Sequence, residues 1–548
     1  MKRKNEDGQM SRDAYEENFS SSNQHPGAFS KATPNTLANR KFLSAHRGEN
    51  RKVEFANHIG ALNTSFYTWF RDQVSNDPAA NLLNGVQDFL DYITHLEDRY
   101  LRSYGEVLTF GSGDCAQLAH GMEEDNDLMV KFPRIVYSLR DKKVTGIACG
   151  GLHNAVYTET GQVFTWGTND TGSLGRVGDE TMPLLVQGLV DAEEIIIGVA
   201  CGDGQTIVVS TAGNVWGWGC YIDKEGKKFF NPSQTAVSQV KDIKKQQNEP
   251  LLIQGLSNVA EVACGSAFNL ALCDDGSVYS WGIGECGELA RKETPLKQKD
   301  EYDLEGILAN HITPGPMQRY KDDFNQEILA VRDVKAIGCG AYHSLVVCLG
   351  DKGGGGGTVL AAGLNNYAQL GMGVEAGSSS GSGDVTSRVY LSRIKSLEGK
   401  GVVCVKGGVH HSLVLTSNGD ILAFGRGDSG QLGISMVSGG GGLSDKAGSF
   451  SAVPVSPALV PQDSSDSSGT SAVAISCGGN HNLVITASND VYTWGYGDML
   501  ALGHGKEEDE PLPKRINFSK AKIGGTINVT QVAGGGQHSA MIGKVLTI

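Results

Sequence analysis

The sequence predicts an all-β fold, a seven-bladed β-propeller, because short strands recur in a long-period repeat. Two phrases carry the prediction: Gly-x-x-His leading into an apolar strand, and Gly leading into a strand that ends in Trp-Gly or Phe-Gly. Runs rich in Val, Ile and aromatic residues between Gly and Asn/Asp turns are typical of strands, about four in each unit. One small sheet cannot bury both of its faces, whereas seven sheets packed around an axis can.

The first phrase occurs seven times, at intervals of 52 to 75 residues. A histidine recurs at one position in five copies, and such regularity favours a structural role, since an imidazole can bridge neighbouring strands. No carboxylate accompanies these histidines, so a metal ring is not expected. The copies begin at Cys149, Cys201, Cys264, Cys339, Lys406, Cys477 and Gly534, and the five histidines are His153, His343, His410, His481 and His538.

The second phrase follows most copies of the first, but its earliest occurrence, from Gly105, has no partner ahead of it. The last copy of the first phrase, near His538, is followed only by a short apolar segment. We therefore expect the strand from Gly105 to complete the last blade and remove the final free edge. A third phrase, as in Asn169 to Gly175, is typical of a tight turn whose leucine anchors it in the core.

Composition and charge limit the kinds of partner. The chain has 548 residues, 74 glycines and a formal net charge of −14. Residues 1–52 carry +4 and residues 53–104 carry −4, so residues 105–548 hold the whole net charge. An acidic propeller argues against a broad nucleic-acid groove but permits a basic protein partner.

Several classes of protein find no support in the sequence. No run of about 18 apolar residues predicts a membrane span, and no phosphate loop, cofactor motif or ordered Ser/His/Asp set predicts a covalent enzyme. The 11 cysteines lack metal-binding spacing. Their number is odd and five share one repeat position, which indicates thiols used as small core residues in a reducing compartment.

The first hundred residues and three later segments fall outside the repeat. Residues 1–52 are polar and basic and are predicted to be a disordered tail. Residues 53–104 carry two apolar stripes at helical spacing, one of them around Trp69, and are predicted to form a helical hairpin. Three insertions rich in glycine and serine are expected to be flexible: 353–357, 372–387 and 435–472.

The three phrases together resemble the regulator of chromosome condensation family, the guanine nucleotide exchange factors of the small GTPase Ran. The resemblance covers residues 105–548. It implies a protein that uses no cofactor and forms no covalent bond, and that grips the GTPase with one face of the propeller. Similar repeats occur in ubiquitin ligases, ciliary proteins and a plant photoreceptor, so a non-catalytic scaffold for ubiquitin-system or trafficking proteins remains the alternative.

One blade departs from the repeat after Trp218. Where other copies read Asn-x-x-Gly-x-Leu-Gly, this copy has a longer, part-polar segment in which Asp223 to Gly226 suit a tight turn. The resemblance implies a β-wedge here, which pushes into the GTPase beside its phosphate-binding loop; an ordinary loop insertion is the alternative. The wedge residues are then Asp223, Lys224, Gly226, Phe229 and Phe230, with Lys227, Lys228 and the two phenylalanines giving the tip its character.

The resemblance also implies contacts between the GTPase and one face of the propeller. The matching residues here are Asp203, His410 with the adjacent His411, and His538. Asp203 stands out because its copy has Gln205 in place of His, and a carboxylate at a loop tip would suit a Lys or Arg of a partner. The next copy departs from the family: it has Ala267 and Phe268, where active members tend to carry an acidic residue before His.

Three short segments stand out in the amino-terminal region: Lys2-Arg3-Lys4, Ser11 to Tyr15 and Leu37 to Lys41. With these segments the region is similar to the front end of a nuclear-basket nucleoporin that binds importin alpha. By this resemblance, the residues that would occupy basic-peptide grooves of importin alpha are Lys2, Arg3, Lys4, Arg40 and Lys41. Short Lys/Arg runs are also typical of nuclear import signals and phosphate-binding tails, so we expect a nuclear protein whose tail binds importin alpha or chromatin.

Overall fold

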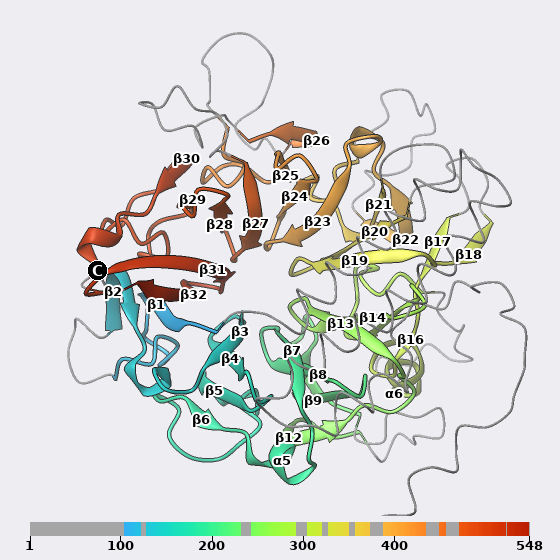
Figure 1. Ribbon diagram of the computed structural model, residues 1–548. Coiled ribbons are helices and arrows are strands. Elements are labelled where there is room, and N and C mark those ends of the chain that lie inside the picture. Colours follow the sequence, from blue (N-terminus) through green and yellow to red (C-terminus); the bar gives the residue numbers. More distant parts are fainter. Residues whose placement is uncertain are drawn as a thin grey trace, which may run out of the picture.

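Seven sheets stand around a central axis in the computed structural model (Figure 1). Within the described residues, six sheets have four strands, one has six, and a separate hairpin has two. The seven-bladed β-propeller predicted from the sequence is thus confirmed. The structure describes residues 104–121, 128–231, 243–291, 304–320, 327–349, 357–372, 387–434, 449–455, 471–521 and 523–546.

Each blade is a meander that starts at the axis and ends at the rim. We number the blades in chain order from the first complete one. Blade 1 has β3 (Val144–Cys149), β4 (His153–Thr158), β5 (Val163–Gly167) and β6 (Leu184–Leu185). Blade 2 has β7 (Ile196–Cys201), β8 (Gln205–Ser210), β9 (Val215–Gly219) and β12 (Gln247–Leu252), with the hairpin β10 (Tyr221–Ile222) and β11 (Lys228–Phe229) inserted before β12. Blade 3 has β13 (Val259–Cys264), β14 (Phe268–Cys273), β15 (Val278–Gly282) and β16 (Gly315–Pro316).

The later blades repeat this order. Blade 4 has β19 (Val334–Cys339), β20 (His343–Cys348), β21 (Thr358–Leu364) and β22 (Ser387–Arg393), extended by β17 (Gln318–Tyr320) and β18 (Ile328–Ala330). Blade 5 has β23 (Val402–Gly407), β24 (His411–Thr416), β25 (Ile421–Gly425) and β26 (Ser449–Pro454). Blade 6 has β27 (Ala472–Cys477), β28 (His481–Thr486), β29 (Val491–Gly495) and β30 (Glu510–Arg515), and blade 7 has β31 (Thr526–Gly534), β32 (His538–Leu546), β1 (Glu106–Ser112) and β2 (Met129–Ile135).

Helices are short throughout the described ranges, and none of them is long and apolar enough to cross a membrane. The α-helices are α5 (Gln187–Asp191) and α6 (Leu304–Gly306). A π-helix, η3, covers Ile307–His311, and the 3-10 helices are η1 (Tyr137–Leu139), η4 (Lys395–Leu397) and η7 (Phe518–Lys520).

The propeller closes as the sequence predicted. β1 pairs antiparallel with β32, from Glu106 opposite Gly543 to Gly111 opposite His538. In Figure 1 the blue β1 therefore lies beside the red β32, although they come from opposite ends of the repeat. Blade 7 is complete only with this strand, because β1 covers the edge of β32 that would otherwise be unpaired.

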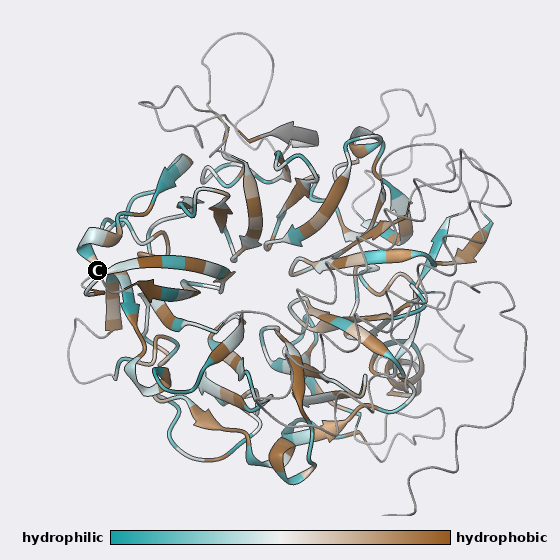
Figure 2. Cartoon of the chain, viewed as in Figure 1, coloured by the Kyte–Doolittle hydropathy of each residue, from teal (hydrophilic) through white to brown (hydrophobic). Residues whose placement is uncertain are grey.

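The blades are held together by apolar side chains between neighbouring sheets. The first six residues of every second strand are buried. Brown also runs along first strands such as β7 and β23 in Figure 2, whereas the outermost β30 is largely teal. Burying one large aliphatic side chain contributes roughly 1.5–3 kcal/mol. The turn leucines are buried as predicted, at Leu118, Leu174, Leu370 and Leu432, and so are the strand tryptophans Trp166, Trp218, Trp281 and Trp494.

The innermost strands surround a channel of about 300 Å³. The five repeat cysteines Cys149, Cys201, Cys264, Cys339 and Cys477 line this channel. All 11 cysteines are free. Burial raises the pKa of Cys201 to about 12, so its thiol stays protonated at neutral pH and acts as a small packing group.

The fifth copy of the repeat begins one residue later than the sequence suggested. β24 starts at His411, which pairs with Gly425 as His153 pairs with Gly167. His411 is therefore the repeat histidine, and Gly407, not Lys406, occupies the cysteine position. The adjacent Gly-Gly and His-His pairs allow the phrase to align in two registers, which is why sequence comparison alone selected His410.

Other expectations are changed or lie outside the described residues. Residues 449–454 form the outer strand β26 and pair with β25, although they fall inside the segment 435–472 that was expected to be a flexible insertion. Serine and glycine on both sides hide this short strand in the composition. The basic tail over 1–52 and the helical hairpin over 53–104, except Tyr104, lie outside the described residues.

Candidate partner-binding face

One face of the propeller carries seven three-residue turns, each joining the first and second strands of a blade. We call these turns the turn ring and this side of the propeller the turn face. Because the turns encircle the channel mouth, every blade contributes backbone and side chains to the same surface. The turn ring comprises residues 150–152, 202–204, 265–267, 340–342, 408–410, 478–480 and 535–537.

Backbone hydrogen bonds connect the turn ring without a break. Each turn donates an amide to a carbonyl of the next: Gly151 to Gly202, Asp203 to Ser266, Ser266 to Ala341, Ala341 to Gly408, Val409 to Gly479, Gly479 to Gly535 and Gly536 to Gly150, at 2.8 to 3.2 Å. The turns lie so close that a Cβ on Gly150 would collide with the carbonyl oxygen of Gly202. The turn ring is therefore a rigid platform, and the side chains that project from it are the groups available to contact a partner.

Directly beneath the turns lies a layer of histidines that binds each blade to the next. Their Nε2 atoms meet a polar side chain at the second position of the neighbouring second strand. The pairs are His153 with Thr206, His343 with Ser412, His411 with Asn482 and His481 with Ser539, each at 2.8 Å, and His538 with Asn154 at 2.7 Å. Gln205 replaces the imidazole in blade 2 and donates to Gly265 O at 3.2 Å, and Phe268 packs at the same position in blade 3.

This layer corrects part of the predicted site. His411 and His538 were expected to contact a GTPase, yet both are 0% exposed. Burial lowers the pKa of His411 to about 4 and that of His538 to about 3, so both rings are neutral at physiological pH. They are ties between blades, and a partner on the surface cannot reach them.

Asp203 projects from the turn ring as the sequence predicted for a surface contact. The residue is exposed, and its carboxylate accepts a hydrogen bond from Ser266 Oγ of the next turn. Packing among the turns raises the pKa of this carboxyl, and the Ser266 bond partly offsets the rise. The second carboxylate oxygen, Oδ1, lies over Gly151 of the preceding turn. Asp203 thus offers a fixed acidic group to a Lys or Arg of a partner.

His410, unlike its neighbour, lies on the surface within an aromatic cluster. Its ring stacks on Tyr342 at 5.9 Å between centroids and lies 4.7 Å from the ring of Tyr367. The guanidinium of Arg426 lies 5.0 Å from the Tyr367 ring centre and donates two hydrogen bonds to Asp428, at 2.9 and 2.6 Å. This cluster spans blades 4 and 5, and sequence reasoning found only its histidine because the aromatic residues come from separate loops.

The hairpin β10–β11 leaves the turn face in blade 2, on the same side as Asp203. β9 ends there, and the next amide, Cys220 N, donates to Gly204 O of the turn ring at 2.9 Å. The predicted tight turn forms: Gly226 has φ +79° and donates to Asp223 O at 3.0 Å. Asp223 Oδ1 accepts from the amides of Glu225 and Lys227, so this aspartate shapes the turn.

The tip and the base of the hairpin differ sharply in exposure. Lys224 to Lys227 are exposed, whereas Phe229 and Phe230 are buried, at 5% and 0% exposed. The two phenylalanines, expected to give the tip its character, instead anchor the base, because the hairpin strands are only two residues long and turn their last side chains into the core. The tip of the hairpin is therefore polar and charged.

Contacts on both sides brace the hairpin against neighbouring blades. Lys228 Nζ donates to Asp170 O of blade 1 at 2.8 Å. On the other side, Lys224 Nζ lies 3.7 Å from Glu285 Oε1 of blade 3, and the Lys224 amide donates to Glu285 Oε2 at 3.2 Å. Exposed ion pairs contribute little to the free energy of folding. Together, the contacts with blades 1 and 3 restrict the direction of the hairpin.

Other candidate features give a simpler picture. Among the described residues, no group of three or more His, Cys, Asp or Glu side chains is arranged to hold a metal ion. The expected importin alpha contacts lie outside the described residues: Lys2, Arg3, Lys4, Arg40 and Lys41.

Comparison with known proteins supports the assignment of the repeat. The chain is 29% identical to protein pim1 of Schizosaccharomyces pombe, over 86% of this chain and 80% of that protein. It is 28% identical to the regulator of chromosome condensation of Mus musculus, over 80% of this chain and 91% of that protein. It is 24% identical to guanine nucleotide exchange factor SRM1 of Saccharomyces cerevisiae, over 87% and 93%.

A solved structure has the same fold. The crystal structure of Prp20p from Saccharomyces cerevisiae, described with its binding properties to Gsp1p and histones, matches with a TM-score of 0.65 at 24% identity, over 82% of this chain and 95% of that one. Prp20 has also been solved bound to Kap60, with the same TM-score and identity. The family model for the RCC1-like domain matches residues 106–541. With its seven blades, its closed strand pairing and this match, the chain belongs to the RCC1-like domain family.

Proposed function

We propose that the protein is a guanine nucleotide exchange factor for a Ran-type small GTPase, acting without a cofactor and without a covalent step. The hairpin β10–β11 supports this most strongly, since it replaces an ordinary turn and presents an exposed charged tip on the turn face. The relatives named as regulators of chromosome condensation and as an exchange factor point the same way.

The mechanism follows from competition between two ligands of the GTPase. Picomolar nucleotide binding corresponds to about −16 kcal/mol, so the factor must stabilise the nucleotide-free GTPase by a comparable amount. Asp203 and the cluster around His410 supply contacts from the turn face, while the hairpin tip occupies the space that the phosphate side of the nucleotide needs. Because the turn ring is rigid, little of this binding energy is lost in ordering the factor itself.

Release of fluorescent GDP from purified Ran tests the proposal. We expect the full chain to accelerate release at substoichiometric concentration, and a variant with residues 223–227 replaced by Gly-Gly to lose the acceleration. The matched control is Lys143→Ala with Glu159→Ala, which removes an exposed ion pair of 3.2 Å on the opposite face. If the intact chain leaves the release rate unchanged, the proposed function is wrong.

One observation favours the alternative, a scaffold that binds partners without catalysis. The turn ring of blade 3 carries Ala267 where an acidic residue was expected, and Phe268 behind it is buried. The two functions separate in one experiment: a scaffold would bind its partner without accelerating GDP release, whereas an exchange factor binds nucleotide-free Ran more tightly than Ran with GDP.

For the amino-terminal tail we propose binding to importin alpha, which would place the protein in the nucleus near chromatin. The Prp20 structures described with Kap60 and with histones support this kind of partner. Replacing Lys2, Arg3 and Lys4 together by alanine should weaken capture by purified importin alpha and reduce nuclear accumulation. Unchanged capture after the additional removal of Arg40 and Lys41 would exclude the tail as the binding element.

A further inference from the structure

The junctions between blades share one hydrogen-bonding pattern in addition to the histidine layer. A polar side chain at the second position of a second strand donates to a backbone carbonyl in the turn that follows the third strand of the preceding blade. In blade 1, Asn154 Nδ2 donates to Gln117 O of blade 7 at 2.7 Å. The other carbonyl pairs are Thr206 to Ser173, Ser344 to Glu288, Ser412 to Gln369, Asn482 to Gln431 and Ser539 to Ala501, at 2.6 to 2.8 Å.

Where the third strand carries a tryptophan, its indole joins the same carbonyl. Trp166 Nε1 donates to Gln117 O at 3.0 Å, Trp218 Nε1 to Ser173 O at 2.7 Å and Trp494 Nε1 to Gln431 O at 3.2 Å. Each such carbonyl therefore accepts two bonds from the next blade. The tight turn formed by the third phrase of the repeat thus has a structural role, because it directs one backbone carbonyl toward the neighbouring sheet.

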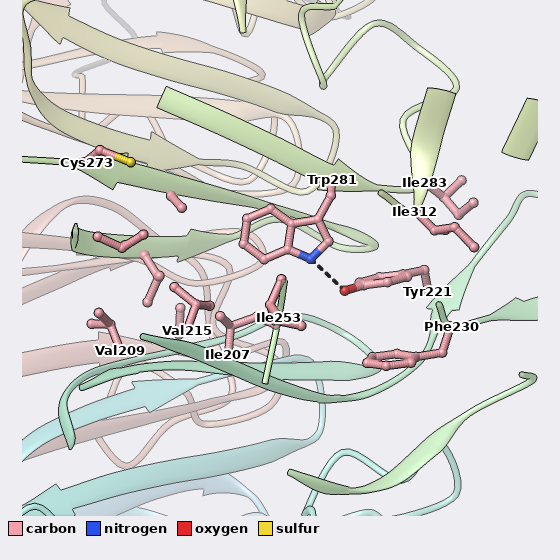
Figure 3. Close-up of a cluster of buried hydrophobic side chains, with 14 of the residues drawn as sticks. Ile207, Val209, Val215, Tyr221, Phe230, Ile253, Cys273, Trp281, Ile283 and Ile312 are labelled. Carbon is pink, nitrogen blue, oxygen red and sulfur yellow. Dashed lines mark hydrogen bonds between the residues drawn. The ribbon is translucent and has the colours of Figure 1, made fainter. Parts of the chain in front are cut away.

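The junction between blades 2 and 3 has no such turn, because the hairpin stands in its place. The two donors are still there, Asn269 and Trp281, and both are fully buried. Both meet the phenol of Tyr221, the first residue of β10. Trp281 Nε1 donates to Tyr221 Oη at 2.9 Å, as the dashed line in Figure 3 marks. The amide of Asn269 contacts the same phenol at 3.1 Å in either of its two orientations.

Tyr221 is also held from below. Its ring stacks on Phe230 at 5.8 Å with an angle of 9° between the planes, and both side chains are 0% exposed. In Figure 3 the Tyr221 ring lies between Phe230 and Ile312, which comes from the segment that follows η3, and all three belong to the cluster that joins blades 2 and 3. The hairpin base thus offers blade 3 a side-chain oxygen at the position where the six other junctions offer a backbone carbonyl.

We infer that Tyr221 is the positioning residue of the hairpin: its phenol replaces the missing turn carbonyl and fixes the base of the wedge to blade 3. The inference rests on the proposed exchange function for its consequence, but the anchoring itself is a property of the propeller. Loss of the phenol oxygen leaves Trp281 Nε1 with an acceptor only in its own blade, the side-chain oxygen of Asn269 at 3.1 Å, so the bond to the hairpin is lost and the hairpin is free to pivot. The GTPase would then still dock on the turn face, while displacement of the nucleotide slows.

Tyr221→Phe tests this, because phenylalanine keeps the stacked ring and removes only the oxygen. The matched control is Ser412→Ala, which removes one fully buried hydroxyl at the equivalent junction between blades 4 and 5. The local measurement is hydrogen exchange of the amides in residues 219–231. We expect faster exchange there in Tyr221→Phe and unchanged exchange there in Ser412→Ala, even if both variants melt at a lower temperature.

The functional measurement is the GDP-release rate as a function of Ran concentration, with the full chain. We expect Tyr221→Phe to lower kcat at least tenfold and to change KM less than threefold, and Ser412→Ala to change neither. A Tyr221→Phe protein with wild-type kcat and wild-type exchange of residues 219–231 would overturn the inference. An inactive wild-type protein would instead overturn the proposed function, and the hydrogen-exchange comparison would still decide whether Tyr221 anchors the hairpin.

Discussion

The turn ring and the histidine layer beneath it are one residue apart along the chain, yet their sequences follow opposite rules. In the layer, five of the seven positions are histidine, and each one reaches a polar side chain of the next blade. In the ring, the residue directly before that position differs from blade to blade, from Gly204 to Tyr342 to His410. Repetition thus marks what joins the blades, and variation marks the surface where we propose that a partner binds.

The sharpest way to break this comparison is to change its two adjacent histidines separately. His411→Ala leaves Asn482 Oδ1 buried without its partner and opens a cavity, so we expect a loss of about 2–4 kcal/mol in the free energy of unfolding. His410→Ala removes a half-buried ring that stacks on Tyr342 and should cost less than about 1 kcal/mol. Urea unfolding of both variants checks the difference, and equal losses would refute the division between ring and layer.

A second test concerns Glu288, which occupies the position that is glutamine in three of the other turns. Burial, followed by nearby Glu285, raises its pKa from 4.5 to about 7. A carboxyl with a raised pKa in the folded state destabilises the protein as pH rises from 4.5 through 7, because the unfolded chain ionises first. Glu288→Gln should therefore raise the free energy of unfolding by about 3 kcal/mol at pH 8 and change it little at pH 4.5.

The control for that experiment is Glu507→Gln, at an exposed position in the corresponding loop of blade 6. It removes the same charge from the surface and should show no such pH dependence. Equal stabilisation at both pH values, or in both variants, would mean that Glu288 is not a buried acid.

The layer also predicts sensitivity to acid. Burial lowers the pKa of His343 to about 3, against an ordinary value of 6.5, so the folded protein keeps this ring neutral. Above pH 6.5 this ring does not lower the free energy of unfolding. As pH falls from 6.5 toward 3 the free energy of unfolding decreases, because the unfolded chain takes up the proton first, and the loss at pH 5 is about 2 kcal/mol. His343→Gln copies the glutamine that blade 2 carries at Gln205. Between pH 5 and 6 this variant should reduce the slope of the unfolding free energy against pH by an amount that corresponds to about one bound proton.

The smallest expected effect on stability is at the surface. Asp203→Ala removes an exposed carboxylate and its bond to Ser266, so the melting temperature should fall by only a few degrees, corresponding to less than about 1 kcal/mol. Affinity for nucleotide-free Ran should fall, because the acidic contact is lost. A large drop in melting temperature with unchanged affinity would show that Asp203 stabilises the turn ring and does not bind the partner.

The sequence was sufficient for the propeller, its number of blades and its closure, because these follow from strand periodicity and from the unpaired phrase at Gly105. It could not separate His410 from His411, since a doubled histidine fits the repeat in two registers. It located the hairpin but not its anchor, because the Tyr221 phenol meets Trp281 across 60 residues of chain. The burial of Phe229 and Phe230 was missed for a related reason: an inserted segment offers no repeat against which to set its apolar positions.

The pairing of β1 with β32 has a consequence for how the protein is made. Among the strands that the structure describes, β1 is synthesised first and β32 last, with more than 400 residues between Ser112 and His538. At about 5–20 residues per second, β1 waits roughly 20 to 90 s for its partner. During translation the growing chain therefore carries an unpaired strand edge, and the final blade can be completed only when the carboxyl-terminal strand has left the exit tunnel.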